Sequence, residues 1–183
     1  MRRPQILLGV TGSVAAKLTP KMVPALQQHG EVDVVATQAA LYFWDRDRTG
    51  AELWTDEHEW PNKRYVKDQD IPHIQLGDQA DILVVAPLTA NTLTKIALGI
   101  ANNLLTSLYY AWPQEKPVIV APAMNTRMWN NPLTQQHLRA LIGRHGNHCY
   151  VDPVAGRLAC NTTGVGRMAQ IDDITDVVRM FLP

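Results

Sequence analysis

Pro117-Val-Ile-Val-Ala121 runs directly into Pro122-Ala-Met-Asn-Thr-Arg-Met-Trp-Asn-Asn-Pro132. The first five residues form a short apolar run, which is typical of a parallel strand buried on both faces. The segment after it places an uncharged amide, Asn125, between two soft apolar residues, Met124 and Met128. Because open α/β sheets bind ligands at the carboxyl ends of their strands, the sequence predicts a small-molecule site here.

The same alternation of strand and helix extends in both directions from this point. Strand-like runs occur at 5–10, 31–37, 81–86, 117–121 and 148–151, and helical spacing occurs at 15–29, 89–98, 102–111, 133–144 and 171–181. This pattern predicts parallel strands joined by crossover helices. The expected fold is therefore α/β, a doubly wound, Rossmann-like or flavodoxin-like parallel sheet. Residues 1–183 suit one domain.

Local signals give more detailed expectations. Gly30 is expected to cap the first helix, Pro87 to end the third strand, and Thr89 to cap the helix that follows it. Residues 38–72 mix tryptophans with many charges, and we expect a short helix and loops there.

Composition excludes several kinds of partner. The 17 Lys and Arg residues balance 17 Asp and Glu residues, so no basic field attracts nucleic acid or anionic lipid. The apolar runs are too short for a membrane span or a signal sequence, so we expect a cytoplasmic protein. Two cysteines, Cys149 and Cys160, make no metal pattern and are expected to stay reduced, so no metal site is expected.

Two loops suggest a bound phosphate. Gly9-Val-Thr-Gly-Ser-Val-Ala15 follows the first strand, and Ala86-Pro-Leu-Thr-Ala-Asn-Thr92 follows the third. Glycine lets a backbone approach a phosphate, and helix starts favour anions. The first loop lacks the G-x-G-x-x-G pattern, and the second strand ends in Thr37 where a dinucleotide site needs an acidic residue. A hydroxyl-rich loop with Ser13 favours a phosphate monoester such as that of FMN.

Together these segments resemble the flavin-containing cysteine decarboxylase family, with Pro-x-Met-Asn-x-x-Met-Trp as the most specific signature. The matching segments span nearly the whole chain: Gly12–Ala16, Leu53–Glu57 with Trp60, His73–Leu76, Asp81, Ala86–Leu93, Asn103–Leu105, Pro122–Pro132 and Arg157–Cys160. The resemblance implies an FMN cofactor and removal of a cysteine carboxylate through reversible oxidation of the thiol-bearing carbon. Within the family, the coenzyme A branch is favoured, with 4′-phosphopantothenoylcysteine as substrate and 4′-phosphopantetheine as product.

The resemblance also implies roles for single residues. His73 would be the base that removes the thiol proton, and Cys160 the acid that protonates the enethiolate in the return reduction. Asn125 would hold the substrate carboxylate without a full positive charge beside it. Further expected substrate contacts are Arg157, Ala159 and Met168. The expected cofactor contacts are Gly12, Ser13, Val14, Thr37, Gln38, Ala39, Thr89, Ala90, Asn91, Thr92 and Ala123.

Trp129 and Met128 are expected to anchor the Asn125 loop in the core. The segment after Cys160 is expected to form a mobile flap over the substrate. Relatives usually carry Gly-Asp after this cysteine, whereas this chain has Asn161 and Thr162.

Two alternative functions stay open at this point. A peptidyl-cysteine decarboxylase would stop at the enethiol, but such relatives lack the flap cysteine. A non-enzymatic regulatory flavoprotein ranks last, because such relatives usually carry long acidic extensions. The resemblance further implies a homo-oligomer, a trimer or a multiple of trimers, with FMN held between subunits and the segment 44–60 as a possible contact.

Overall fold

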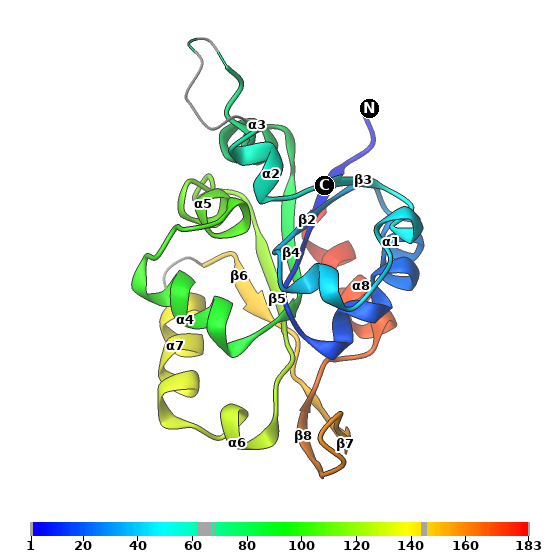
Figure 1. Ribbon diagram of the computed structural model, residues 1–183, viewed down its shortest axis with the longest axis vertical. Helices are drawn as coiled ribbons and strands as arrows, with labels where there is room; N and C mark the ends of the chain where they lie inside the picture. The colour runs from blue at the N-terminus through cyan, green and yellow to red at the C-terminus, as the bar shows by residue number, and fades with distance from the viewer. Residues whose placement is uncertain (1, 62–66, 68, 144–145, 183) are drawn as a thin grey trace.

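The computed structural model describes residues 2–61, 67, 69–143 and 146–182, and its centre is a six-stranded parallel sheet (Figure 1). The strand order is β3-β2-β1-β4-β5-β6, the order of a doubly wound Rossmann-type sheet. The expected fold class is confirmed. The strands are β1 Gln5–Val10, β2 Glu31–Ala36, β3 Glu52–Trp54, β4 Ile82–Leu88, β5 Val118–Pro122 and β6 His148–Tyr150.

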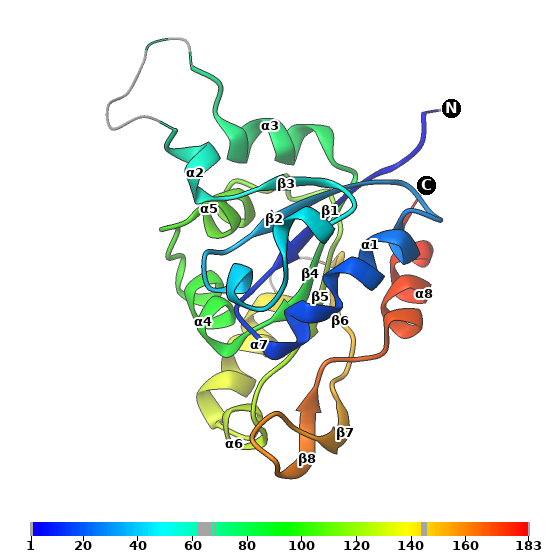
Figure 2. The ribbon, with the colours of Figure 1, turned by 45° about the vertical axis from the view of Figure 1, so that its right-hand side comes forward.

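Helices cover both faces of the sheet (Figures 1 and 2). On one face, α1 (Thr19–Leu26) and α8 (Ile171–Phe181) pack against β1, β2, β4 and β5. The opposite face is covered by α3 Pro72–Gln79, α4 Ala90–Leu98, α5 Leu104–Tyr110 and α7 Pro132–Gly143. Ile6 and Leu8 point into the first core and Leu7 into the second, which explains why these strands read as continuous apolar runs.

The first predicted helix is wrong in detail. The chain forms a short 3₁₀ helix, η1 (Val14–Leu18), and then α1, instead of one helix over 15–29. Pro20 has no N–H to donate to the Ala16 carbonyl, so the helical hydrogen bonds are interrupted there. The Thr19 hydroxyl donates to the Ala16 carbonyl instead, at 2.7 Å. Gly30 is not a left-handed cap; a Cβ there would lie 2.4 Å from the Pro4 carbonyl, so its role is close backbone approach.

Other boundaries also differ from expectation. Pro87 does not end the third strand, since β4 continues through it to Leu88. Thr89 does cap α4, accepting a hydrogen bond from the Thr92 N–H at 3.3 Å. Arg144, the expected last residue of the helix at 133–144, lies outside the described residues.

Short elements fill the connections that the sequence left irregular. They are η2 Ala40–Tyr42, η3 Arg46–Arg48, α2 Asp56–Glu59 and α6 Thr126–Trp129, together with an antiparallel hairpin of β7 Val154–Arg157 and β8 Thr163–Arg167. The hairpin stands where a flap was expected and lies beside α6 at one end of the molecule (Figure 2).

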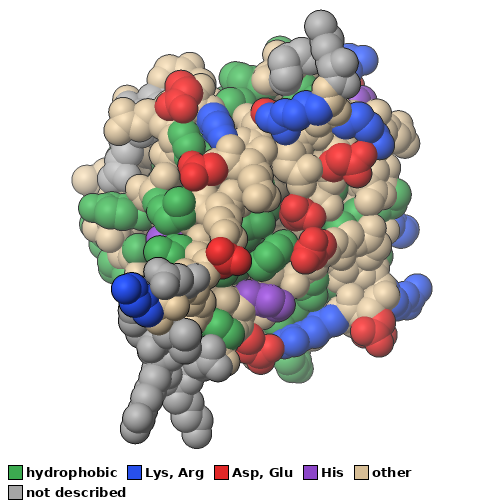
Figure 3. Space-filling view, turned by 90° about the horizontal axis from the view of Figure 1, so that it is seen from above, with side chains coloured by type: hydrophobic (Ala, Val, Ile, Leu, Met, Phe, Trp, Pro, Cys, Tyr) green, Lys and Arg blue, Asp and Glu red, His purple; other side chains and the backbone are tan. Residues whose placement is uncertain are grey.

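Acidic and basic side chains are interspersed over the face shown in Figure 3, without a field of one sign. Within the described ranges, no helix is long and apolar enough to cross a membrane.

Candidate active site

Four loops meet at the carboxyl edge of the sheet, because β1, β2, β4 and β5 are parallel. The buried Thr11 side chain ties two of them together. Its hydroxyl donates to the Pro87 carbonyl at 2.7 Å and accepts from the Thr89 N–H at 2.9 Å. The loops after β1 and β4 are therefore fixed to each other at the point where the strand order reverses.

A cavity of about 540 Å³ opens among these loops, within the range usual for small-molecule sites. All eleven predicted cofactor contacts line it: Gly12, Ser13, Val14, Thr37, Gln38, Ala39, Thr89, Ala90, Asn91, Thr92 and Ala123. Four further lining residues, Phe43, Asp56, Lys95 and Asn103, were not expected beside the cofactor. Met124 and Met128, which flank Asn125, also line the cavity.

The cavity wall has features that fit a flavin nucleotide. The Thr37 hydroxyl is buried and has no hydrogen-bond partner among the described residues, so it is free to bond a ligand. A Cβ on Gly12 would lie 2.6 Å from the Ala39 Cβ, so only glycine lets these two loops approach. Ser13 caps η1 by accepting from the Ala15 N–H at 3.3 Å.

Met128 was expected to anchor the loop in the core, and this prediction is wrong. Its side chain is exposed and lines the cavity, whereas Trp129 packs partly buried against the core. The reason is the single turn of α6, which points the two neighbouring side chains in different directions.

Asn125 and Cys160 meet at the edge of this loop, although 35 residues separate them in the sequence. The Asn125 Nδ2 donates to the Cys160 Sγ at 2.9 Å, and the Asn125 Oδ1 accepts from the Arg127 N–H at 2.8 Å. The Thr162 hydroxyl lies 3.0 Å from the same sulfur. These bonds lower the pKa of the exposed Cys160 thiol, with the contribution from Thr162 the largest.

The two departures from the family pattern have physical explanations in the hairpin. Asn161 has a φ of 61°, a left-handed conformation that asparagine tolerates better than most residues, as glycine does. The neighbouring Thr162 supplies a neutral hydroxyl partner for the Cys160 sulfur. Asn161 also accepts a hydrogen bond from Arg157 at 3.3 Å.

The expected substrate contacts are distributed unevenly. Arg157 and Ala159 are exposed on the hairpin near Cys160. Met168 is buried in the core instead, packed beneath the sheet with α1 and α8, and does not line the cavity. Its expected role in substrate binding has no geometric support within one chain.

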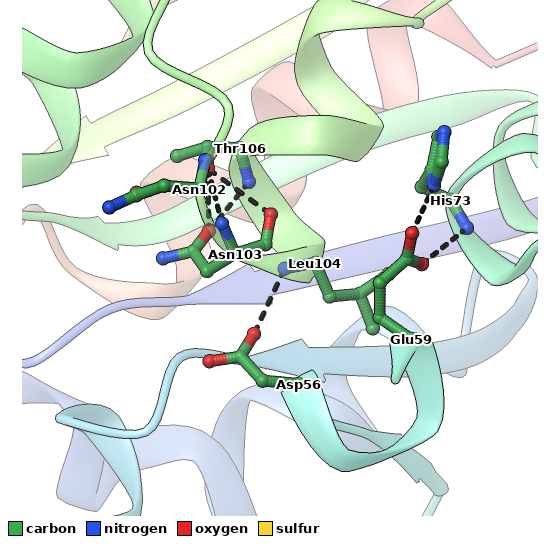
Figure 4. A network of polar contacts seen from close by, with 7 residues as sticks. All are labelled: Asp56, Glu59, His73, Asn102, Asn103, Leu104 and Thr106. Carbon is green, nitrogen blue, oxygen red and sulfur yellow. Dashed lines mark hydrogen bonds and ion pairs between the residues drawn. The ribbon is translucent and has the colours of Figure 1, made fainter. Parts of the chain in front are cut away.

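His73 lies outside the cavity, in the first turn of α3 (Figure 4). Its ring Nδ1 contacts the Glu59 Oε1, and its backbone N–H donates to the Glu59 Oε2 at 3.2 Å. At the other end of α2, the Asp56 carboxylate accepts from the Leu104 N–H at 2.9 Å, at the start of α5. The four residues of α2 thus link the cavity wall to His73 through carboxylates that each meet a helix N-terminus.

The parallel sheet and its cavity at the strand-order reversal define an α/β protein built to bind a nucleotide-sized ligand. The chain belongs to the flavoprotein family, whose model matches residues 1–183.

Several named proteins and solved structures are similar to this chain over nearly its whole length. Phosphopantothenoylcysteine decarboxylase HAL3 of Malus domestica is 47% identical over 98% of this chain and 84% of its own length. The solved structure of a PPC decarboxylase mutant complexed with pantothenoylaminoethenethiol is 42% identical, with a TM-score of 0.92 and 98% of each chain covered. The solved structure of the FMN binding protein AtHal3 is 43% identical, with a TM-score of 0.87, and covers 98% of this chain and 97% of its own.

Proposed function

We propose that this chain is an FMN-dependent decarboxylase that converts 4′-phosphopantothenoylcysteine to 4′-phosphopantetheine in coenzyme A biosynthesis. The observation that carries the proposal is the contact of Asn125 with Cys160 beside a cavity lined by all the predicted cofactor contacts. Relatives named phosphopantothenoylcysteine decarboxylase, up to 47% identical, support the activity.

FMN would be held by the loops after β1, β2, β4 and β5. The Ser13 hydroxyl and the backbone N–H groups near Gly12 would bind its phosphate. The Thr37 hydroxyl, which has no partner among the described residues, would bond a polar atom of the cofactor. Bound FMN supplies reversible two-electron oxidation, the chemistry that a saturated carbon next to a carboxylate needs before it can lose carbon dioxide. The relative described as an FMN binding protein supports this cofactor.

Each side chain then has a proton or a charge to handle. His73 takes the proton of the substrate thiol, and Cys160 gives a proton to the enethiolate carbon in the return step. Asn125 keeps one amide hydrogen on the Cys160 sulfur and has a second to offer the substrate carboxylate. A mutant relative complexed with an ethenethiol compound supports an enethiol on the reaction path.

Because His73 does not line the cavity of its own chain, we propose that a neighbouring copy completes the site in a homo-oligomer, a trimer or a multiple of trimers. Exposed apolar side chains near His73, including Trp60, Ile71 and Ile74, would be covered there. Of the three tryptophans at 44–60, Trp44 is buried and Trp60 is the most exposed, so Trp60 is the one suited to such a contact. We also propose a cytoplasmic location and one working domain over 1–183.

Mixed oligomers test this arrangement. His73→Asn and Asn125→Asp subunits, each inactive alone, should regain part of the activity when refolded together, because some sites then combine both intact residues. Sedimentation of the wild type measures the size. A monomer, or a mixture that stays inactive, would contradict the shared site.

The activity itself is tested by incubating the holoenzyme with 4′-phosphopantothenoylcysteine and determining the molecular mass of the product by mass spectrometry. The wild type should release carbon dioxide and form 4′-phosphopantetheine. Cys160→Ser should accumulate a product lacking two further hydrogens, since only the return step loses its acid. A wild-type product that also lacks two hydrogens would favour an enethiol-forming decarboxylase, and no carbon dioxide would refute decarboxylation of this substrate.

A further inference from the structure

Glu59 makes an unusual pair of contacts for a residue in a connecting turn. Its side chain is only 7% exposed, and each of its two oxygens meets a nitrogen atom of the same residue, His73. One oxygen accepts from the His73 backbone N–H at 3.2 Å, and the other contacts the ring Nδ1 (Figure 4).

Helix capping explains only half of this arrangement. A carboxylate at the first turn of α3 satisfies the free N–H of His73 and complements the helix dipole. The contact with the ring adds nothing to capping. A buried carboxylate is costly unless its oxygens are paired, and a carboxylate accepts but never donates. With Glu59 as the carboxylate, the contact is a hydrogen bond only when the proton is on the His73 Nδ1.

We propose that Glu59 is a positioning residue for His73, which keeps the ring proton on Nδ1 and leaves Nε2 free to accept the substrate thiol proton. This inference rests on the proposed function, in which His73 is the base. When Nε2 takes the thiol proton, the Nδ1 proton stays in place and the ring becomes a cation beside the buried carboxylate. Glu59 thus fixes the tautomer and stabilises the charge that forms, as the acidic member of a catalytic triad does.

The ring can be observed directly in holoenzyme labelled with ¹⁵N at the histidine rings. The protein has six histidines, and the signals missing in His73→Asn assign the ring of interest. At a pH where the ring is neutral, the wild type should show a protonated Nδ1 and an unprotonated Nε2. Glu59→Leu removes the acceptor, so the signals should shift toward the form with the proton on Nε2. An unchanged tautomer in Glu59→Leu overturns the proposal.

Kinetics supply the second readout. Substrate-dependent flavin reduction should slow by roughly 10- to 100-fold in Glu59→Leu, the usual effect of losing an outer partner of a functional imidazole, with KM nearly unchanged. Glu59→Gln keeps an acceptor without the charge and should fall between the wild type and Glu59→Leu. Glu57→Gln is the matched control, because Glu57 lies on the same turn but is exposed, 3.7 Å from Arg46.

A purely structural Glu59 would give a different pattern. Both variants would then lower thermal stability but keep the wild-type rate in the folded fraction, and that result overturns the proposal. If the wild type itself fails to reduce flavin with this substrate, the proposed function fails, while the nitrogen signals still decide whether Glu59 sets the tautomer.

Discussion

Cys160 combines exposure with specific hydrogen bonds, and this combination makes its chemistry measurable. Bonds from Thr162 and Asn125 stabilise the thiolate and lower the pKa of the thiol below its ordinary 9.0. Because a thiolate is the species that reacts with alkylating agents, the pH dependence of alkylation reports this pKa.

Thr162→Val should move that pH dependence. Valine keeps the shape but removes the largest stabilising hydrogen bond, so the pKa of Cys160 should rise and alkylation should need a higher pH. Iodoacetamide modification followed by mass analysis from pH 6 to 10 measures the midpoint. Thr162→Ser, which keeps the hydroxyl, is the control. A midpoint in Thr162→Val equal to that of the wild type would show that the hydroxyl does not act on the sulfur.

Among single residues, the sequence identified those that carry a motif and missed those that depend on packing. Asn125 lies in a specific signature, and the hydroxyl-rich loops at Gly12 and Thr89 indicated a phosphate. Glu59 could not be chosen in advance, because its partner His73 becomes a neighbour only when α2 meets α3. Thr162 was noticed only as a departure from the family pattern, because its contact with the Cys160 sulfur depends on how the hairpin turns. In the sequence, nothing distinguishes Glu59 from the other acidic residues of this polar segment; only its burial in the folded protein does.

At Gly166 the backbone of the β7–β8 hairpin is bonded to the cavity loop. Gly166 has a φ of 137°, and its carbonyl accepts from the Met124 N–H at 2.9 Å. A Cβ there would lie 2.3 Å from the Met124 carbonyl oxygen. The backbone of β8 therefore touches the loop that carries Asn125.

Gly166→Ala should detach this contact. Strain and overlap together should destabilise the protein by about 1–3 kcal/mol and separate Asn125 from Cys160. Urea unfolding measures the free energy, and Cys160 alkylation reports the lost bond. Gly156→Ala in β7 is the control, since its Cβ would meet only the Arg167 side chain at 3.5 Å. Equal stability of the two variants would contradict this account of the hairpin.

Strand β2 carries an acidic residue in an unfavourable position. Asp33 pairs across β2 and β3 with Glu52, and burial together with this repulsion raises the pKa of the Asp33 carboxyl above 3.8. The folded protein thus holds this proton more tightly than the unfolded chain does. The stabilising effect is full at acid pH and is lost as pH rises through the raised pKa.

Asp33→Asn should therefore stabilise the protein at pH 7. Asparagine keeps an acceptor for the Gln5 amide, now 2.8 Å away, and removes the like-charge pair, so the gain should be roughly 0.2–1 kcal/mol. Urea unfolding at pH 7 and near pH 4 checks the sign, because the difference from the wild type should shrink at the lower pH. An equal gain in the free energy of unfolding at both pH values would mean that the stabilisation does not come from removing the charge.

Helices and strands were predictable where they bury a regular pattern of apolar side chains. They were not predictable where the secondary structure depends on pairing or packing with a neighbouring element. The runs at β1, β4 and β5 are apolar on both faces and were found from the sequence. β3 has only three residues, and it becomes a strand by pairing with β2. Pro72–Gln79 contains glycine, aspartate and two glutamines, and it forms α3 because Leu76 packs on the sheet.

At the level of the whole protein, cofactor and stability are coupled. The wall of the cavity comes from segments that follow five different strands, β1 to β5, so a bound ligand favours only the fully assembled sheet. FMN at a hundredfold excess over its Kd should add about 2.7 kcal/mol to the free energy of unfolding relative to the apoprotein. Thermal unfolding with and without FMN measures this. Gly12→Ala should respond less, because its Cβ would press on Ala39; a full response would place FMN elsewhere.

The single turn of α2 has a mechanical consequence. Asp56 lines the cavity and Glu59 contacts His73, and both residues belong to the four-residue helix α2. A ligand that displaces α2 at the cavity would therefore also displace Glu59, and with it the His73 ring. Occupancy of the cavity and the orientation of the imidazole would then be coupled through α2.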